Sequence, residues 1–259
     1  MNTAQQLQVP RWPCRPTRTT VRTSYEARMT HFDDPDAVTR YAAGALRMVP
    51  GLHDLHKMSR ILLAEGAGPQ AEIPVHGAGG GMELTAFAHA EPSWRFCGVD
   101  PSAAMLDLAR RTLGPHSARA TLHQGYIDTA PPGPFDGATS LLTLHFLPRD
   151  ERLQTLRGLH SRLRPGARLV TAHHSIPQPD KILWLTRFAA FAQSNGLPPD
   201  QAAQMVPTLD TRLPTLPPDE DRALLLDAGF TDAPLFYAAL TFRGWVATTP
   251  PTSPTAPCA

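Results

Sequence analysis

Cysteine is scarce in this sequence, which has three in 259 residues: Cys14, Cys97 and Cys258. They lie far apart, so neither a disulfide framework nor a CxxC metal site is predicted. Cys97 falls in an apolar strand pattern, where we expect a buried, unreactive thiol. No apolar run is long enough to span a membrane, and the N-terminus lacks the apolar core of a signal peptide. These absences favour a reducing, cytoplasmic location.

Net charge is almost absent too, at +1. A chain whose net charge creates no strong electrostatic field is not expected to bind nucleic acid or an acidic membrane through charge alone. The arginines of the N-terminal segment are the one basic group, and we interpret them as a solvated tail. With 42% hydrophobic residues the chain can bury a core, which indicates a globular domain.

Proline is plentiful, at 28 residues, but unevenly placed. The start (VPRWPCRPTRTTVRT) and the end (TTPPTSPTAPCA) are rich in proline and lack apolar periodicity. Residues 1–28 and 248–259 are therefore predicted to be disordered tails around a domain at 29–247. A start of translation at Met29 is a further hypothesis.

Within the domain, helical and strand patterns alternate. A helix is expected to begin at Asp33–Pro35 and end before Pro50. Further helices are expected at Leu52–Ala64, Met82–Ala90, Ala103–Leu113, Asp150–Leu163, Trp184–Gln193 and Asp219–Ala228. Strands are expected at Ile73–His76, Trp94–Val99, Ala120–His123, Asp136–Leu144, Arg168–Ala172, Phe230–Tyr237 and Ala239–Ala247. Such alternation indicates a parallel sheet, interrupted at residues 175–220 by a helical insertion.

A glycine cluster, HGAGGG at 76–81, joins the first strand to its helix. Gly77 and Gly79 fit the dinucleotide fingerprint, but Met82 stands where its third glycine belongs, which disfavours an NAD-dependent oxidoreductase. No lysine and hydroxyl follow, so a P-loop is excluded. Gly81 gives G-x-G-x-G, a loop that suits an uncharged or zwitterionic ligand. Asp100, ending the next strand, can accept both hydroxyls of a ribose.

Together HGAGGG, GVDPSAAML and LRPGARLV resemble the Rossmann-like (class I) S-adenosylmethionine-dependent methyltransferases over about residues 30–247. The resemblance implies a three-layer α/β sandwich with a mostly parallel seven-stranded sheet whose last strand is antiparallel. It implies that the glycine loop binds the methionine part of S-adenosylmethionine and that Asp100 binds its ribose. The cofactor-binding positions that it implies are Tyr41, Gly77, Ala78, Gly79, Gly81, Asp100, Pro101, Met105, Tyr126, Ile127, Leu142 and Thr143.

Three further stretches, VPGL at 49–52, LTLHFLP at 142–148 and AGFTDAPLFYAALTFRGWVA at 228–247, resemble the subgroup containing bacterial carboxy-S-adenosylmethionine synthase, which acts in tRNA wobble-uridine modification. That relative holds its extra carboxylate with an arginine in the insertion. Val206 stands at the matching place here, and Arg212 lies two helical turns further on. We therefore expect a methyltransferase acting on a small molecule, and the resemblance suggests a homodimer.

Two alternatives stay open. One is an enzyme like carboxy-S-adenosylmethionine synthase, which consumption of prephenate would reveal. The other is a non-catalytic S-adenosylmethionine-binding protein, because Val75 and Tyr126 replace acids that the family usually has beside the glycine loop and near the adenine.

Histidines follow the fourth and fifth expected strands: His145, His173 and His174. Carboxyl ends of parallel strands face the ligand crevice, and histidine is the natural base near neutral pH. We therefore predict His145, His173 and His174 as candidate catalytic residues. The alternatives are histidines that only bond the backbone, or a metal site, for which they lack any local ligand motif.

Overall fold

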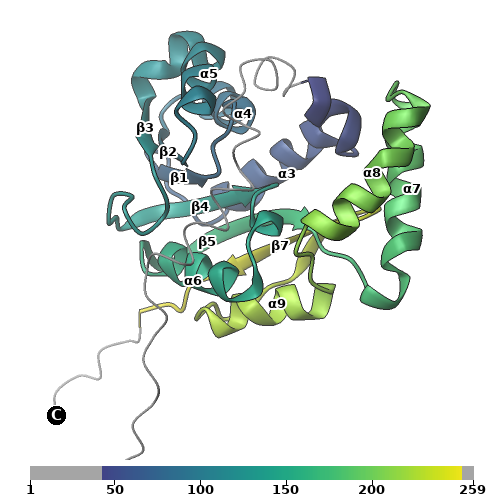
Figure 1. Ribbon diagram of the computed structural model, residues 1–259. Helices are drawn as coiled ribbons and strands as arrows, with labels where there is room; N and C mark the ends of the chain where they lie inside the picture. Colours follow the sequence, from purple (N-terminus) through teal and green to yellow (C-terminus); the bar gives the residue numbers. More distant parts are fainter. Residues whose placement is uncertain (1–42, 253–259) are drawn as a thin grey trace, which may run out of the picture.

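The computed structural model describes residues 43–252 (Figure 1). Tyr41, the predicted helix start at Asp33 and the predicted N-terminal tail lie outside this range. Residues 43–48 are helical, as expected for the end of the first helix.

Seven strands form one sheet, in the order β3-β2-β1-β4-β5-β7-β6. Their bounds are β1 Glu72–His76, β2 Arg95–Asp100, β3 Ala120–Gln124, β4 Phe135–Leu141, β5 Leu163–His174, β6 Leu235–Ala239 and β7 Phe242–Thr248. β7 pairs antiparallel with both β5 and β6, whereas the pairs among β1 to β5 are parallel. This confirms the predicted mixed sheet with an antiparallel last strand.

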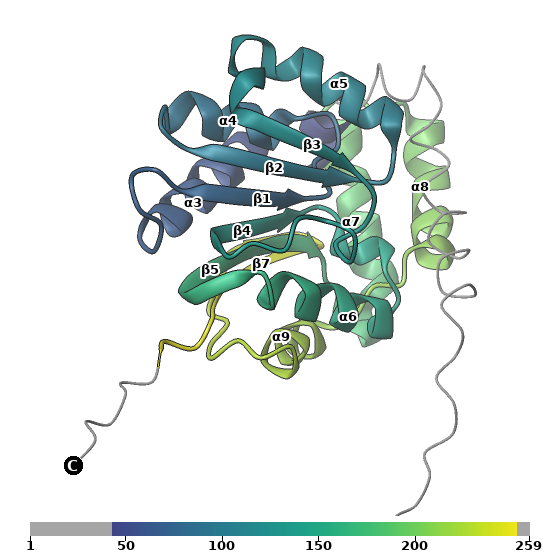
Figure 2. The same cartoon turned by 90° about the vertical axis from the view of Figure 1, so that its left-hand side faces the viewer.

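Helices cover both faces of the sheet and make the predicted three layers (Figure 2). One face carries α3 (Leu52–Ala64), α4 (Met82–Ala90) and α5 (Ala103–Leu113), and the other carries α6 (Arg149–His160) and α9 (Pro218–Asp227). The predicted insertion after β5 consists of α7 (Lys181–Ser194) and α8 (Pro199–Arg212), and Phe188 of α7 packs on His174 at the carboxyl end of β5 and on Phe242 of β7. Short 3-10 turns lie at Gly114–Arg119, Leu144–Phe146 and Gln178–Asp180.

Alternating side chains of the strands build two cores, one on each face. In β2, Phe96 packs into the cluster with Phe87 of α4, while Cys97 packs into the cluster with Leu156 of α6. Successive strand residues point to opposite faces, so a buried strand must be apolar on both. The Cys97 thiol is buried, and burial, helped by Glu72, raises its pKa to about 11.

Some strand bounds differ from the predictions. β4 ends at Leu141 and not at Leu144, because Leu142 has a φ of 58° and turns the chain out of the extended conformation. β5 begins at Leu163, earlier than predicted, because Leu163 pairs with Phe135 of β4. β6 begins at Leu235 and not at Phe230. These differences come from pairing and backbone turns that local composition does not encode.

The described part of the chain continues past residue 247, where the domain is predicted to end. β7 includes Thr248, and Thr249 is buried with its hydroxyl donating to the Arg164 carbonyl at 2.7 Å. The Pro250 carbonyl accepts from the Gly166 amide at 3.3 Å. These bonds attach the start of the predicted C-terminal tail to the beginning of β5. Within residues 43–252, no helix has the length and apolar character needed to cross a membrane.

Candidate functional site

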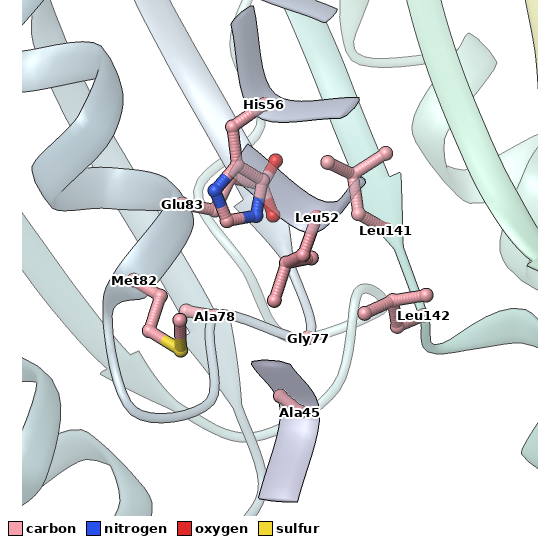
Figure 3. Close-up of a pocket in the computed structure, with 9 residues that line it drawn as sticks. All are labelled: Ala45, Leu52, His56, Gly77, Ala78, Met82, Glu83, Leu141 and Leu142. Carbon is pink, nitrogen blue, oxygen red and sulfur yellow. The ribbon is translucent and has the colours of Figure 1, made fainter. Parts of the chain in front are cut away.

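A pocket lies where the sheet order reverses, between β1 and β4 (Figure 3). In open α/β sheets, ligands bind outside the carboxyl ends of strands at such a switch point. The pocket is lined by the helix at residues 43–48, by α3, by the loop after β1 with the start of α4, and by the end of β4 with its following loop: Ala45, Leu52, His56, Gly77, Ala78, Met82, Glu83, Leu141 and Leu142.

Gly77 brings the β1 and β4 loops into contact. Its φ is 74°, and a Cβ there would lie 2.0 Å from the Thr143 Oγ1. Thr143 is itself fixed, because its hydroxyl donates to the Leu141 carbonyl at 2.9 Å. The missing side chain therefore makes room for the neighbouring loop, while Gly77 and Ala78 line the pocket beside it.

Gly81 has a packing role in the structure, and its predicted contact with the cofactor stays a prediction. It precedes α4 with a φ of 80°, and a Cβ there would lie 2.7 Å from the Ala109 Cα in α5. Gly81 is thus needed for α4 to pack on α5, and it is not among the described residues that line the pocket.

Asp100 connects the glycine loop to the end of β2. Its side chain is buried, with Oδ2 accepting from the Gly79 amide and Oδ1 from the Ser102 amide, each at 2.9 Å. The carboxylate therefore holds the loop in place without a ligand. Its predicted bonds to ribose hydroxyls would have to share these oxygens, and that role stays a prediction.

The other predicted cofactor positions lie along the edge from β2 to α6. Met105 is buried in the first turn of α5, where its amide donates to the Ser102 hydroxyl at 3.2 Å. Ile127 is buried in the core cluster that includes α6, and Tyr126 packs against that cluster. Pro101 is half-buried, with its carbonyl accepting from Gln124 at 3.4 Å. Of the predicted residues, Gly77, Ala78 and Leu142 line the pocket.

Glu83 and His56 are the ionisable residues of the pocket, and neither was among the predicted site residues. Glu83 is buried in the first turn of α4, and burial raises its pKa to about 8, with the Thr139 hydroxyl partly offsetting the effect. Burial, then His53, lowers the pKa of His56 to about 4. An acid within the apolar stretch MELTAFAHA was the sequence signal for Glu83, whereas His56 resembles an ordinary member of the buried face of α3.

The three predicted catalytic histidines are buried and do not line the pocket. The His174 ring stacks on Phe242 with centroids 4.0 Å apart, and its Nδ1 lies 2.8 Å from the Thr241 Oγ1. The His145 Nδ1 accepts from the His174 amide at 3.4 Å. For all three, burial is the largest cause of a pKa below the usual value of 6.5.

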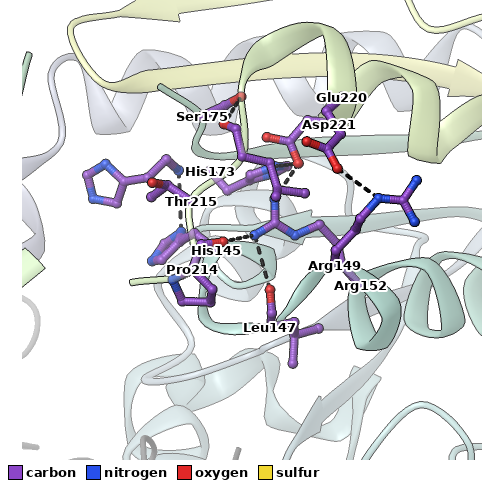
Figure 4. A network of polar contacts seen from close by, with 12 residues as sticks. His145, Leu147, Arg149, Arg152, His173, Ser175, Pro214, Thr215, Glu220 and Asp221 are labelled. Carbon is purple, nitrogen blue, oxygen red and sulfur yellow. Dashed lines mark hydrogen bonds and ion pairs between the residues drawn. The ribbon is translucent and has the colours of Figure 1, made fainter. Parts of the chain in front are cut away.

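His173 contacts a buried ion pair between α6 and α9 (Figure 4). Arg152 of α6 and Asp221 of α9 form this pair, and neither side chain reaches solvent. Arg152 also donates to the Leu147 and Pro214 carbonyls at 3.2 and 3.0 Å. Burial alone would raise the pKa of Asp221, but His173 and Arg152 outweigh it and hold the pKa below its usual value. In the described chain, no three histidine, cysteine or acidic residues are grouped so as to hold a metal.

Comparison with known proteins agrees with this geometry. Residues 76–169, from the end of β1 into β5, match the family model described as "Methyltransferase domain". A carboxy-S-adenosyl-L-methionine synthase of Chromohalobacter salexigens is 30% identical over 154 residues, which are 58% of this chain and 57% of that protein, so the match spans little more than half of the relative. A synthase of the same name from Campylobacter hominis is 26% identical over 204 residues, 78% of this chain and 87% of that one.

Among solved structures, human N-acetylserotonin methyltransferase in complex with S-adenosylmethionine superposes with a TM-score of 0.57. It is 12% identical and the match covers 86% of this chain and 58% of the human one, a likeness of fold alone. The family model, the relatives and the fold agree: residues 76–169 match a methyltransferase domain, and the chain is similar to carboxy-S-adenosyl-L-methionine synthases in sequence and to S-adenosylmethionine-dependent methyltransferases in fold.

Proposed function

We propose that this protein binds S-adenosylmethionine in the switch-point pocket and uses it to methylate a small-molecule acceptor. The observation that carries the proposal is the pocket itself, in which a loop anchored by Asp100 faces the buried carboxyl of Glu83. These residues fit the cofactor, because its amino-acid part is zwitterionic, its sulfonium is cationic, and the pocket offers one acid among apolar walls.

When bound, S-adenosylmethionine supplies an electrophilic methyl group. The protein's contribution is to align the acceptor with that group and to exclude water. Leu141 and Leu142 at the end of β4 give the pocket an apolar wall suited to that task. A catalytic role for His145, His173 or His174 stays a prediction, since their mutual contacts account for their burial without it.

Calorimetric titration with S-adenosylhomocysteine, S-adenosylmethionine and NAD tests the proposal. We expect micromolar binding of the two adenosyl ligands by the native protein, no binding of NAD, and loss of binding in Asp100→Ala, because that variant frees the Gly79 amide and the loop. A thermal melt of the variant checks that it is folded. Absence of adenosyl binding by the native protein would overturn the proposal. Binding without turnover over a broad panel of acceptors would favour a non-catalytic binding protein.

A carboxy-S-adenosylmethionine synthase is the second candidate, because both curated relatives carry that name. A carboxylate added to the cofactor needs a cationic partner. None of the described residues lining the pocket is arginine or lysine, which favours methyl transfer. Incubation with S-adenosylmethionine and prephenate separates the two activities, because only the synthase yields a cofactor heavier by one carboxyl group in mass spectrometry.

We further propose that the protein works in the cytoplasm, as a homodimer and without nucleic acid. The few cysteines support the cytoplasmic location, the near-neutral charge supports the absence of nucleic acid, and the resemblance to carboxy-S-adenosylmethionine synthase suggests the homodimer. Light scattering of the purified protein, with and without added tRNA, tests the last two points.

A further inference from the structure

One oxygen of a carboxyl group in the pocket lacks a hydrogen-bond partner in the described chain. Glu83 is 6% exposed, and its Oε1 has no hydrogen-bond partner among residues 43–252. The nearby Thr139 Oγ1 is also unpartnered there. Burying a polar group without a partner is costly, so such a group inside a pocket indicates a missing ligand atom.

The position of Glu83 directs its carboxyl toward the switch point. Thr139, which acts on the Glu83 pKa, lies on β4 and is in register with Val75 of β1. Val75 is fully buried and offers no charge, so Glu83 is the acid at this junction of the two strands. His76 and Ser140, one residue further along each strand, bond each other at 3.0 Å and face the opposite side of the sheet.

The surroundings of Glu83 select a positively charged ligand atom. The pocket walls are otherwise apolar or glycine, apart from His56 of α3. The lowered pKa of His56 leaves it neutral at pH 7. No charged group of α3, α5, β1, β2 or β4 contributes to the pKa of Glu83, which burial dominates. The described pocket therefore contains no cation to neutralise Glu83.

We propose that Glu83 is the counter-ion for the primary ammonium of the ligand that fills this pocket, and that Glu83 releases one proton when the ammonium binds. On the proposed function, on which this inference rests, that group is the α-ammonium of the cofactor's amino-acid part. Because burial raises the pKa of Glu83 to about 8, the neutral carboxylic acid is its main form in the free protein at pH 7. Arrival of the ammonium turns it into a carboxylate, and the proton passes to solvent, so charge and atoms balance.

Titration with two adenosyl probes, in two buffers of different ionisation enthalpy at pH 7, tests the inference. S-adenosylhomocysteine carries the ammonium, and 5′-methylthioadenosine lacks the whole amino-acid part. We expect release of about one proton with the first probe and none with the second. Glu83→Gln should weaken S-adenosylhomocysteine binding roughly 10- to 100-fold, the range for a lost hydrogen bond to a charged group, and leave 5′-methylthioadenosine binding unchanged.

Asp107→Asn is the matched control, because it removes an exposed acid of α5 outside the pocket. It should change neither affinity nor proton release. Thermal melts should show Glu83→Gln at least as stable as the native protein, since it removes a buried carboxyl whose Oε1 has no hydrogen-bond partner in the described chain. Equal affinities of Glu83→Gln and the native protein for S-adenosylhomocysteine, or equal proton release with both probes, overturn the inference alone. A native protein that binds neither probe overturns the proposed function and the inference with it.

Discussion

At the scale of single residues, the entry into α4 leaves no room for a side chain. Gly81 combines a φ of 80° with the backbone of α5 at Ala109 immediately beside it. A non-glycine residue would be strained there even in open space, and the contact with Ala109 adds a second penalty that a rotamer change cannot relieve.

Gly81→Ala should therefore destabilise the protein by roughly 2–5 kcal/mol, the sum of left-handed strain and overpacking. Gly51→Ala is the control, because Gly51 has a φ of 64° with no heavy atom within 4 Å of its would-be Cβ. That control should cost only the strain, about 1–2 kcal/mol. Urea unfolding of both variants measures the difference, and equal losses would show that the contact with α5 carries no cost.

At the scale of elements, α6 and α9 are joined by Arg152 and Asp221. Removing one partner of a buried ion pair leaves the other charged and without compensation, whereas replacing both by apolar residues is often tolerated. The pair also sets the environment of His173, whose Nε2 lies 3.2 Å from the Asp221 Oδ1. The spacing of these two helices therefore depends on both residues together.

Asp221→Asn should cost roughly 3–5 kcal/mol of unfolding free energy. The double variant Arg152→Met with Asp221→Leu should lose less than the single one. Asp219→Asn, an exposed position in the same turn of α9, is the matched control and should cost under about 1 kcal/mol. Guanidinium unfolding gives all three values, and a double variant worse than Asp221→Asn would contradict this account of the pair.

At the scale of the whole molecule, buried histidines should govern the response to acid. His56, His76, His145, His173 and His174 all have pKa values lowered from 6.5, to about 4 for His56 and His76 and about 3 for His174. Each contributes stability that is complete above pH 6.5 and is lost as the pH falls toward the folded pKa, because only the unfolded chain takes up the proton.

Glu83 acts in the opposite direction, because its pKa is raised from 4.5 to about 8 and its contribution is lost as the pH rises through 8. Asp221 has a lowered pKa, so its contribution to stability changes only below about pH 4. The five histidines outnumber these groups between pH 6.5 and 4. Each contributes up to ~1.4 kcal/mol per pH unit in that window.

The urea midpoint should therefore fall steeply from pH 7 to pH 5. His56→Gln should reduce the dependence of the urea midpoint on pH by the contribution of one histidine, since glutamine does not titrate. A midpoint that stays constant over this range would show that the buried histidines do not control acid stability.

Local sequence predicted the elements well where capping and periodicity were strong. The bounds of α3, α4 and α5 match those expected, because glycine, serine or proline stands at their starts and the apolar residues repeat with helical spacing. The end of β4 was wrong because the left-handed Leu142 is set by its bond to the Ala172 carbonyl, in a strand distant in sequence.

The candidate site could be predicted in part for the same reason. The glycine loop and Leu142 are local signals, and the structure places Gly77, Ala78 and Leu142 in the pocket. Arg152 gave no such signal, since arginine in a polar helix is normally exposed and its partner is 69 residues away. The burial of His145, His173 and His174 follows from packing between helices, which strand order alone does not determine.

The ion pair between α6 and α9 has a consequence for how this chain can diverge over time. Losing Arg152 or Asp221 alone would produce a sequence variant much less stable than a protein with both charges or with neither. Natural selection removes such intermediates, so the two positions should change together or not at all. Descendants of this sequence should accordingly carry both charges or neither, although the codons that encode them lie in separate parts of the gene.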